Sequence, residues 1–126
     1  MGEHGVPAPV RGFIASHIVS VAQLDVLLLL RAAADKRWTA EEVARALVTQ
    51  PDAAKGWLRD LAERGLADEG ESTYRYSPAN EELSRVIDEL AESYANYRVA
   101  VIGLIFARPS ERITSLADAF RIRRKH

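Results

Sequence analysis

The sequence predicts a mainly α-helical fold that contains one small β-hairpin. Apolar residues recur at helical spacing through most of the chain. After Gly65 the pattern changes, and two short segments alternate apolar and polar residues around a turn. The chain has 126 residues, of which 48% are hydrophobic, so it is long enough for one domain with a modest core.

The composition of the chain limits which binding partners and which kinds of site it can have. The formal net charge of −1 gives no overall attraction to nucleic acid or to an anionic membrane, so such a partner would need a local patch. The absence of cysteine excludes disulfides and thiolate metal sites. The longest apolar runs, 26–30 and 99–107, are shorter than the roughly 20 residues that span a bilayer. We therefore expect a soluble, cytoplasmic protein without a membrane partner.

The first part of the chain predicts a leader and two helices. Residues 1–12 lack the basic region and apolar core of a secretory signal, and we expect them to form a flexible leader. We expect residues 13–19 to form a short helical turn. Ser20 is the expected N-cap of a stronger helix that runs to about Ala34. That helix is apolar on more than one side, so other elements should cover it on more than one side.

A helix, a tight turn and a second helix follow. Thr39 and Glu42 form a Thr-x-x-Glu capping box, which places a helix start at Thr39. The expected turn covers residues 48–52, and Pro51 suits the first turn of the next helix. An apolar residue follows Gly65, which is the order expected when a glycine in the left-handed conformation ends a helix.

The predicted hairpin consists of two strands and a polar turn. Residues 66–68 and 73–77 have the strand pattern, and residues 69–72 form the turn between them. Pro78 should end the second strand, because proline has no amide hydrogen to donate.

The apolar pattern of residues 80–107 predicts one long helix. At this length it would extend ~42 Å, whereas a compact chain of this size has a radius of gyration of roughly 14 Å. Its end should therefore protrude, and because that end is also its most apolar part, we predict a homodimer built on residues 94–107. The alternative is that the helix breaks near Gly103 and folds back over the helix that begins at Ser20. The predicted dimer interface consists of Tyr94, Tyr97, Val101, Ile102, Ile105 and Phe106.

The tail, residues 108–126, predicts a basic amphipathic helix. It carries six Lys or Arg against Glu111 and Asp118, a net charge of +4, which leaves −5 on the rest of the chain. One interpretation is a solvated helix end that complements the helix dipole. The other is an arm that contacts phosphates or docks on a partner protein. The residues concerned are Arg121, Arg123, Arg124 and Lys125.

No catalytic or metal-binding pattern is present. His4, His17 and His126 are scattered and have no spacing typical of metal ligands. Ser16 is adjacent to His17 in the sequence, but no third residue completes a nucleophilic site. The glycines mark turns and form no phosphate-binding loop. We expect a protein that is not an enzyme and that uses no cofactor and no metal.

The order of these elements resembles the winged helix-turn-helix domain of bacterial transcription regulators, broadly of the MarR type. The resemblance covers about residues 20–78, and its most specific part is Leu58-x-x-Leu61-x-x-x-Gly65-Leu66 followed by a hairpin. It implies that the second helix of the pair enters the DNA major groove while the hairpin, the wing, contacts the backbone or minor groove. The implied DNA-binding residues are Thr49, Gln50, Lys55, Gly56, Arg59 and Arg75, with Glu63 beside them.

The sequence pattern and the resemblance together predict a division of the chain. Residues 1–12 are the leader, 13–78 the winged-helix domain, 79–107 the dimerisation helix and 108–126 the tail.

The sequence departs from the family in its charge. Between residues 50 and 78, four basic residues stand against six acidic ones. Phosphate neutralisation dominates duplex affinity, so a net acidic surface is poorly suited to DNA. Arg59 and Arg64 also lie four residues from Glu63 and Asp60, respectively, and can pair with them. Two functions therefore stay open: a homodimeric regulator that binds double-stranded DNA, and a winged-helix module that binds another protein.

Overall fold

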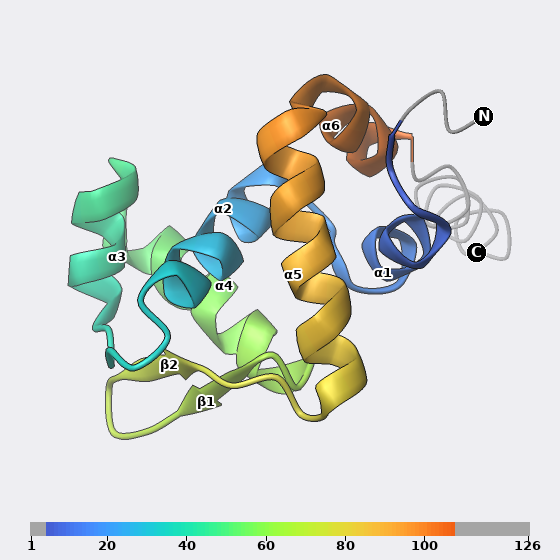
Figure 1. Ribbon diagram of the computed structural model, residues 1–126. Coiled ribbons are helices and arrows are strands. Elements are labelled where there is room, and N and C mark those ends of the chain that lie inside the picture. Colours follow the sequence, from blue (N-terminus) through green and yellow to red (C-terminus); the bar gives the residue numbers. More distant parts are fainter. Residues whose placement is uncertain (1–4, 108–126) are drawn as a thin grey trace, which may run out of the picture.

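The computed structural model describes residues 5–107, which form six helices and one two-stranded antiparallel sheet (Figure 1). The helices are α1 (Ala8–His17), α2 (Val21–Ala32), α3 (Ala40–Leu47), α4 (Pro51–Glu63), α5 (Glu81–Asn96) and α6 (Arg98–Phe106), and the strands are β1 (Ala67–Glu69) and β2 (Tyr74–Tyr76). The expected mainly α-helical fold with a small hairpin is confirmed. The predicted tail helix lies outside the described residues.

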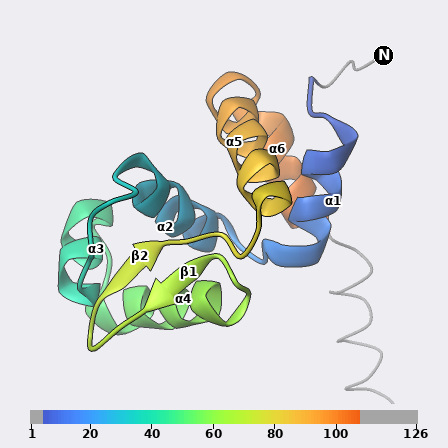
Figure 2. The same cartoon turned by 60° about the horizontal axis from the view of Figure 1, so that its bottom comes forward.

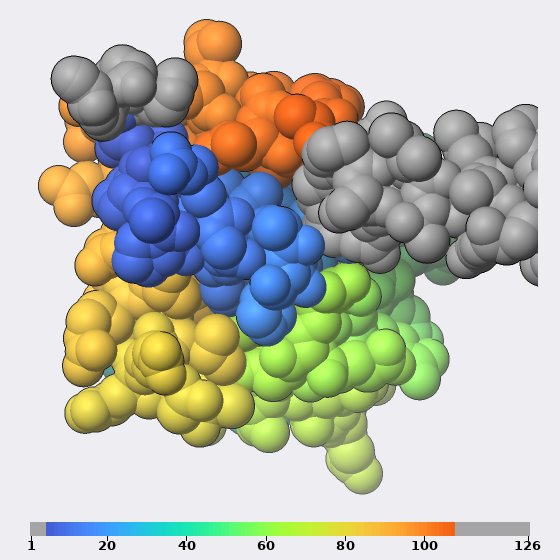
Figure 3. Space-filling view, turned by 90° about the vertical axis from the view of Figure 1, so that its right-hand side faces the viewer, coloured from blue at the N-terminus to red at the C-terminus, as the bar shows by residue number. Residues whose placement is uncertain are grey.

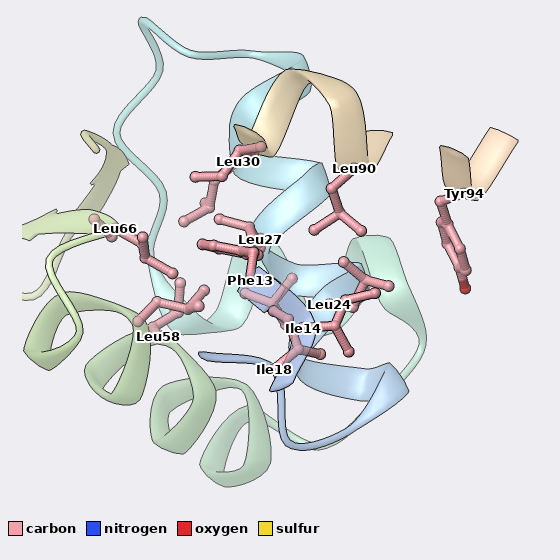
Figure 4. Close-up of a cluster of buried hydrophobic side chains, with 14 of the residues drawn as sticks. Phe13, Ile14, Ile18, Leu24, Leu27, Leu30, Leu58, Leu66, Leu90 and Tyr94 are labelled. Carbon is pink, nitrogen blue, oxygen red and sulfur yellow. The ribbon is translucent and has the colours of Figure 1, made fainter. Parts of the chain in front are cut away.

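The elements form two groups around a shared core. The first group contains α2, α3, α4 and the hairpin, and the second contains α1, α5 and α6 (Figure 2). Leucine and isoleucine side chains from both groups meet in the core (Figure 4). Two polar contacts also join α2 to α5: Arg31 Nε lies 3.0 Å from Asp88 Oδ1, and the Tyr94 hydroxyl donates to Asp25 Oδ1 at 3.3 Å. As expected, α2 is covered on more than one side.

Side-chain caps fix the starts of several helices. The Thr39 hydroxyl accepts a hydrogen bond from the Glu42 amide at 3.1 Å, and the Glu42 carboxylate accepts one from the Thr39 amide at 3.0 Å. The predicted capping box is therefore complete. Ser20 caps α2 and Asn80 caps α5 more simply. In each case one side-chain oxygen accepts a hydrogen bond from a backbone amide in the first turn of the helix.

The end of α4 has the predicted glycine. Gly65 has φ +80°, and its amide donates to the Ala62 carbonyl at 3.1 Å. The Leu66 amide donates to the Leu61 carbonyl at 2.9 Å, and both leucine side chains are fully buried. These two bonds satisfy carbonyls in the last turn of the helix, and the chain then continues into β1.

The hairpin is extended by a third segment. Its strands pair with Ala67 opposite Tyr76 and Glu69 opposite Tyr74. The first strand is displaced by one residue from the predicted limits, and the second is one residue shorter at each end. Trp38, just before α3, exchanges two backbone hydrogen bonds with Tyr74, at 2.7 and 2.8 Å. This bridge ties β2 to the start of α3.

The predicted flexible leader is wrong for the part that the structure describes. Helix α1 begins at Ala8, within residues 1–12, and Val6 and Val10 are buried. Val6, Val10 and Phe13 follow one another at helical spacing across the expected boundary, so the apolar stripe of α1 starts before Phe13. Pro7 and Pro9 do not oppose this start, since proline is tolerated before and within the first turn.

The predicted long helix is also wrong, because the chain breaks at Tyr97. There φ is −135° and ψ is 52°, and α6 turns back to pack against α1 and α5 (Figure 3). The break lies earlier than the Gly103 alternative. It buries Val101 and Ile105, and burying such a side chain contributes about 1.5–3 kcal/mol. This outweighs the few helical hydrogen bonds lost, each worth about 1 kcal/mol net.

No single helix among residues 5–107 is both long and apolar enough to cross a membrane. Helices α1 and α2 reach the required length and composition only when taken together, and they are bent by 113° relative to each other.

Candidate nucleic-acid interface

Helix α4 has one buried face and one exposed face. Ala54, Leu58 and Leu61 are fully buried where α4 packs on α2, α3 and β1. The opposite face is exposed and carries the predicted residues Lys55, Gly56 and Arg59. The helical spacing of the buried residues determines this orientation.

The other predicted residues flank this face. Thr49 and Gln50 are exposed in the turn before α4, and Arg75 is exposed on β2. A Cβ added at Gly56 would meet nothing within 4 Å, so the fold does not require a glycine there. The structure thus places all six predicted residues on the surface of the first group, and it brings Lys55, Gly56 and Arg59 together on α4.

Several acids near this surface are paired with arginines. Arg64 Nε lies 2.8 Å from Asp60 Oδ2, as the spacing predicted. The predicted pairing of Arg59 with Glu63 is replaced by a contact with the hairpin, in which Arg59 Nε lies 3.9 Å from Glu69 Oε2. Sequence spacing missed this partner because β1 folds back beside α4.

Arg37 is a residue that sequence reasoning missed. Its Nε donates to the Thr73 hydroxyl at 3.0 Å, and its Nη1 donates to Asp68 Oδ2 at 3.2 Å. A Cβ at Gly70 would collide with the Arg37 guanidinium, so the glycine lets this side chain lie against the hairpin turn. One acid of the hairpin is therefore neutralised from the loop between α2 and α3.

The exposed charges that remain are mixed. Lys55 makes no ion pair within residues 5–107. Asp52 and Glu63 are exposed on the same helix, and Glu71 is exposed in the hairpin turn. Pairing of the hairpin acids reduces the acidic character that the sequence indicated, but it leaves a surface with both signs of charge.

Gln23 fixes α4 against the rest of the protein. Its side chain is fully buried, and its amide donates to Asp60 Oδ2 at 2.5 Å and to the His17 carbonyl at 3.0 Å. Its own side-chain oxygen accepts from the Val19 amide at 2.6 Å. Because Asp60 lies on α4, these bonds link the α1–α2 connection to that helix. The sequence signal was the position of Gln23, three residues after the cap Ser20.

Most of the predicted dimer interface lies inside the protein. Tyr94, Val101 and Ile105 are buried in its own core, which corrects their assignment to a dimer contact. Ile102 is half-buried, and Tyr97 and Phe106 are exposed. The stripe at helical spacing was therefore largely the inward face of α5 and α6. Val99, which lies in the predicted range 94–107 but is not among the six named interface residues, is 85% exposed on α6.

No protein-family model, curated protein or solved structure matches this chain.

A cavity of about 440 Å³ between α1 and the start of α5 brings Ser16, His17 and Glu82 together. Within the described chain, no hydrogen bond joins these three side chains. Neighbouring residues on a helix also point in different directions, so Ser16 and His17 do not form a nucleophile and base pair. Burial lowers the pKa of His17, and the nearby charge of Arg64 lowers it further. We derive no reaction from this cavity.

Among residues 5–107, no three acidic or histidine side chains gather in a group that could hold a metal ion. The basic residues Arg121, Arg123, Arg124 and Lys125 lie outside the described residues.

Proposed function

We propose that the protein is a DNA-binding transcription regulator with a winged-helix fold, broadly of the MarR type, that acts as a homodimer. One observation carries the proposal. The α3–turn–α4 unit leads directly into a hairpin that packs beside α4, and the face of α4 away from the core presents Lys55, Gly56 and Arg59.

Helix α4 is the element that enters the major groove in this proposal. It has 13 residues and is about 20 Å long, which suits insertion of its exposed face into a groove. Lys55 and Arg59 contact phosphates or guanine edges, and Gln50 reads an adenine. The open space at Gly56 lets the helix backbone approach the DNA closely.

The hairpin serves as the wing. Arg75 on β2 contacts a phosphate, while Arg37 neutralises Asp68 of the opposite strand. Positive charge from Arg121, Arg123, Arg124 and Lys125 adds phosphate contacts that the mixed surface of α4 lacks.

The dimer uses the outward face of α6. Val99 is exposed on this face, and Gly103 has open space around it. A glycine inside a helix costs about 1 kcal/mol relative to alanine, and close approach of a second helix would make use of it. A twofold axis beside α6 would give a symmetric dimer that presents two copies of α4, one from each protomer. Replacing Val99 with glutamate should then shift sedimentation from dimer to monomer, whereas a monomeric wild type would contradict the dimer.

The second candidate is a winged-helix module that binds another protein. The exposed acids Asp52, Glu63 and Glu71 favour this function, because they lie on the surface that DNA would occupy. A basic partner surface would fit them.

Binding to a random-sequence duplex, measured by fluorescence anisotropy over a range of salt concentrations, tests the proposal. Regulator function predicts that the logarithm of affinity falls linearly with the logarithm of salt. Arg59→Gln should weaken binding and reduce the slope by about 1. Arg85→Gln is the matched control, since Arg85 is exposed on α5 in the other group. Absence of duplex binding at about 50 mM salt, where non-specific binding is strong, would favour the protein-binding module.

A further inference from the structure

Arg59 is held by a residue of the hairpin. Its Nε lies 3.9 Å from Glu69 Oε2, and the two side chains remain 59% and 43% exposed. The contact crosses from α4 to β1, so it joins the proposed recognition helix to the proposed wing.

The Glu69 carboxylate is kept in place from its other side. The Tyr74 hydroxyl donates to the same Glu69 oxygen at 3.1 Å, and Tyr74 is the cross-strand partner of Glu69. Tyr74 is itself buried and bonded through its backbone to Trp38. The carboxylate that faces Arg59 is therefore attached to a fixed part of the fold.

Such a pair contributes little to stability. An exposed ion pair with a long separation is worth about 0–1 kcal/mol. A phosphate group can displace the carboxylate, because the present contact is a single one of 3.9 Å, whereas a guanidinium can bind phosphate through two parallel hydrogen bonds. Displacement nevertheless has a cost, since any anion that uses Arg59 must first separate it from Glu69.

We propose that Glu69 is an internal competitor that occupies Arg59 and lowers the affinity of the α4 face for polyanions. For DNA, this inference rests on the proposed function. As a statement about polyanions it can be tested without DNA.

The hairpin supplies its own control. Glu71 lies two residues from Glu69, is exposed in the turn and makes no ion pair with any described residue. Glu69→Gln and Glu71→Gln change the net charge by the same amount in nearly the same place. A difference between the two variants therefore reports the contact with Arg59 and not the overall charge.

The experiment measures the salt concentration at which each variant elutes from immobilised heparin and its affinity for a random duplex. Glu69→Gln should elute at higher salt than Glu71→Gln and bind duplex about three- to fivefold more tightly, the fold-change that corresponds to loss of a weak exposed pair. Its salt slope should stay close to that of the wild type, because Arg59 makes the same phosphate contact in both proteins and only the cost of separating it from Glu69 is removed. Tyr74→Phe, which frees Glu69 without changing charge, should shift elution in the same direction by less.

The same comparison in an Arg59→Gln background decides whether the effect passes through Arg59. The difference between Glu69→Gln and Glu71→Gln should vanish there. Equal elution of the two variants with Arg59 present, a difference that survives without Arg59, or no heparin binding by any variant would overturn the inference. If the Arg59-dependent difference appears on heparin while no variant binds duplex, the inference stands and the proposed DNA function fails.

Discussion

Helices α3 and α4 differ in which terminus carries favourable cap residues: the N-terminus in α3 and the C-terminus in α4. Helix α3 begins with a complete capping box at Thr39 and ends at Val48, which has φ +55°. Helix α4 begins at Gln50 without a side-chain cap and ends at Gly65, which has φ +80°. The Thr49 amide donates to the Ala44 carbonyl just as the Leu66 amide donates to the Leu61 carbonyl, so the two ends share one backbone motif with different residues.

The two less favourable termini meet in the same turn. A β-branched residue in the left-handed region is strained, and Val48 is 90% exposed, so burial of its side chain does not compensate. Gln50 leaves the first amides of α4 without a side-chain acceptor. The favourable termini, at Thr39 and Gly65, adjoin the hairpin. The turn at residues 48–50, where the proposed DNA surface begins, thus lacks the favourable cap residues that Thr39 and Gly65 supply at the other two termini.

Among changes at these helix termini, replacing Gly65 with valine should have the largest effect on the free energy of unfolding. It would give α4 the same strained end as α3, and we expect a loss of about 2 kcal/mol in the free energy of unfolding, measured with urea. Gly12→Val is the control, because Gly12 lies inside α1 with open space around it. Equal losses for the two variants would show that the left-handed conformation at Gly65 is not the cause.

The reverse exchange, Val48→Gly, should stabilise the protein. Relief of the left-handed valine gains about 1–2 kcal/mol, and the extra freedom of glycine in the unfolded chain removes roughly half of this. The midpoint of urea unfolding should therefore rise, whereas Ala53→Gly, on the exposed face of α4, should lower it. A lower midpoint for Val48→Gly would mean that the turn is not strained.

The smallest expected effect is the pH dependence of the stability that His17 contributes beside the C-terminus of α4. The pKa of His17 lies below its usual value of 6.5 because the ring is partly buried and Arg64, the C-cap residue of α4, is near. The unfolded chain therefore binds the proton more tightly. The His17 contribution is fully present above about pH 6.5 and is lost as pH falls through the lowered pKa.

Unfolding free energies of wild type and His17→Asn, compared between about pH 7.5 and 5.5, test this prediction. The difference between the two proteins should shrink as pH falls, and a pH-independent difference would contradict it. Because Arg64 caps the C-terminus of α4 and is remote in sequence from the turn at residues 48–50, amide exchange should increase first at the end of α4.

The features that sequence could predict are those set by neighbours in the chain. Thr39 and Glu42 are three residues apart, and Gly65 directly precedes an apolar residue, so local hydrogen bonding determines both. The exposure of Lys55 and Arg59 likewise follows from the helical spacing of buried residues on α4.

The features that sequence could not predict depend on distant segments. The break at Tyr97 places its ring against Gly5, where any side chain would collide with it, and nothing near Tyr97 in the sequence indicates this. The partners of Arg59 and Gln23 likewise depend on how β1 and the α1–α2 connection pack beside α4. The candidate surface was therefore predictable in its composition but not in its ion pairs.

The bridge between Trp38 and Tyr74 bears on the order of folding. The two residues are separated by 36 positions in the chain, and everything between them forms α3, α4 and β1. Contacts this distant form late, after local helices have shortened the loop that must close. A two-stranded hairpin alone is barely stable in water. We therefore expect the hairpin to be completed only after α3 and α4 have assembled, as the last part of its group to become rigid.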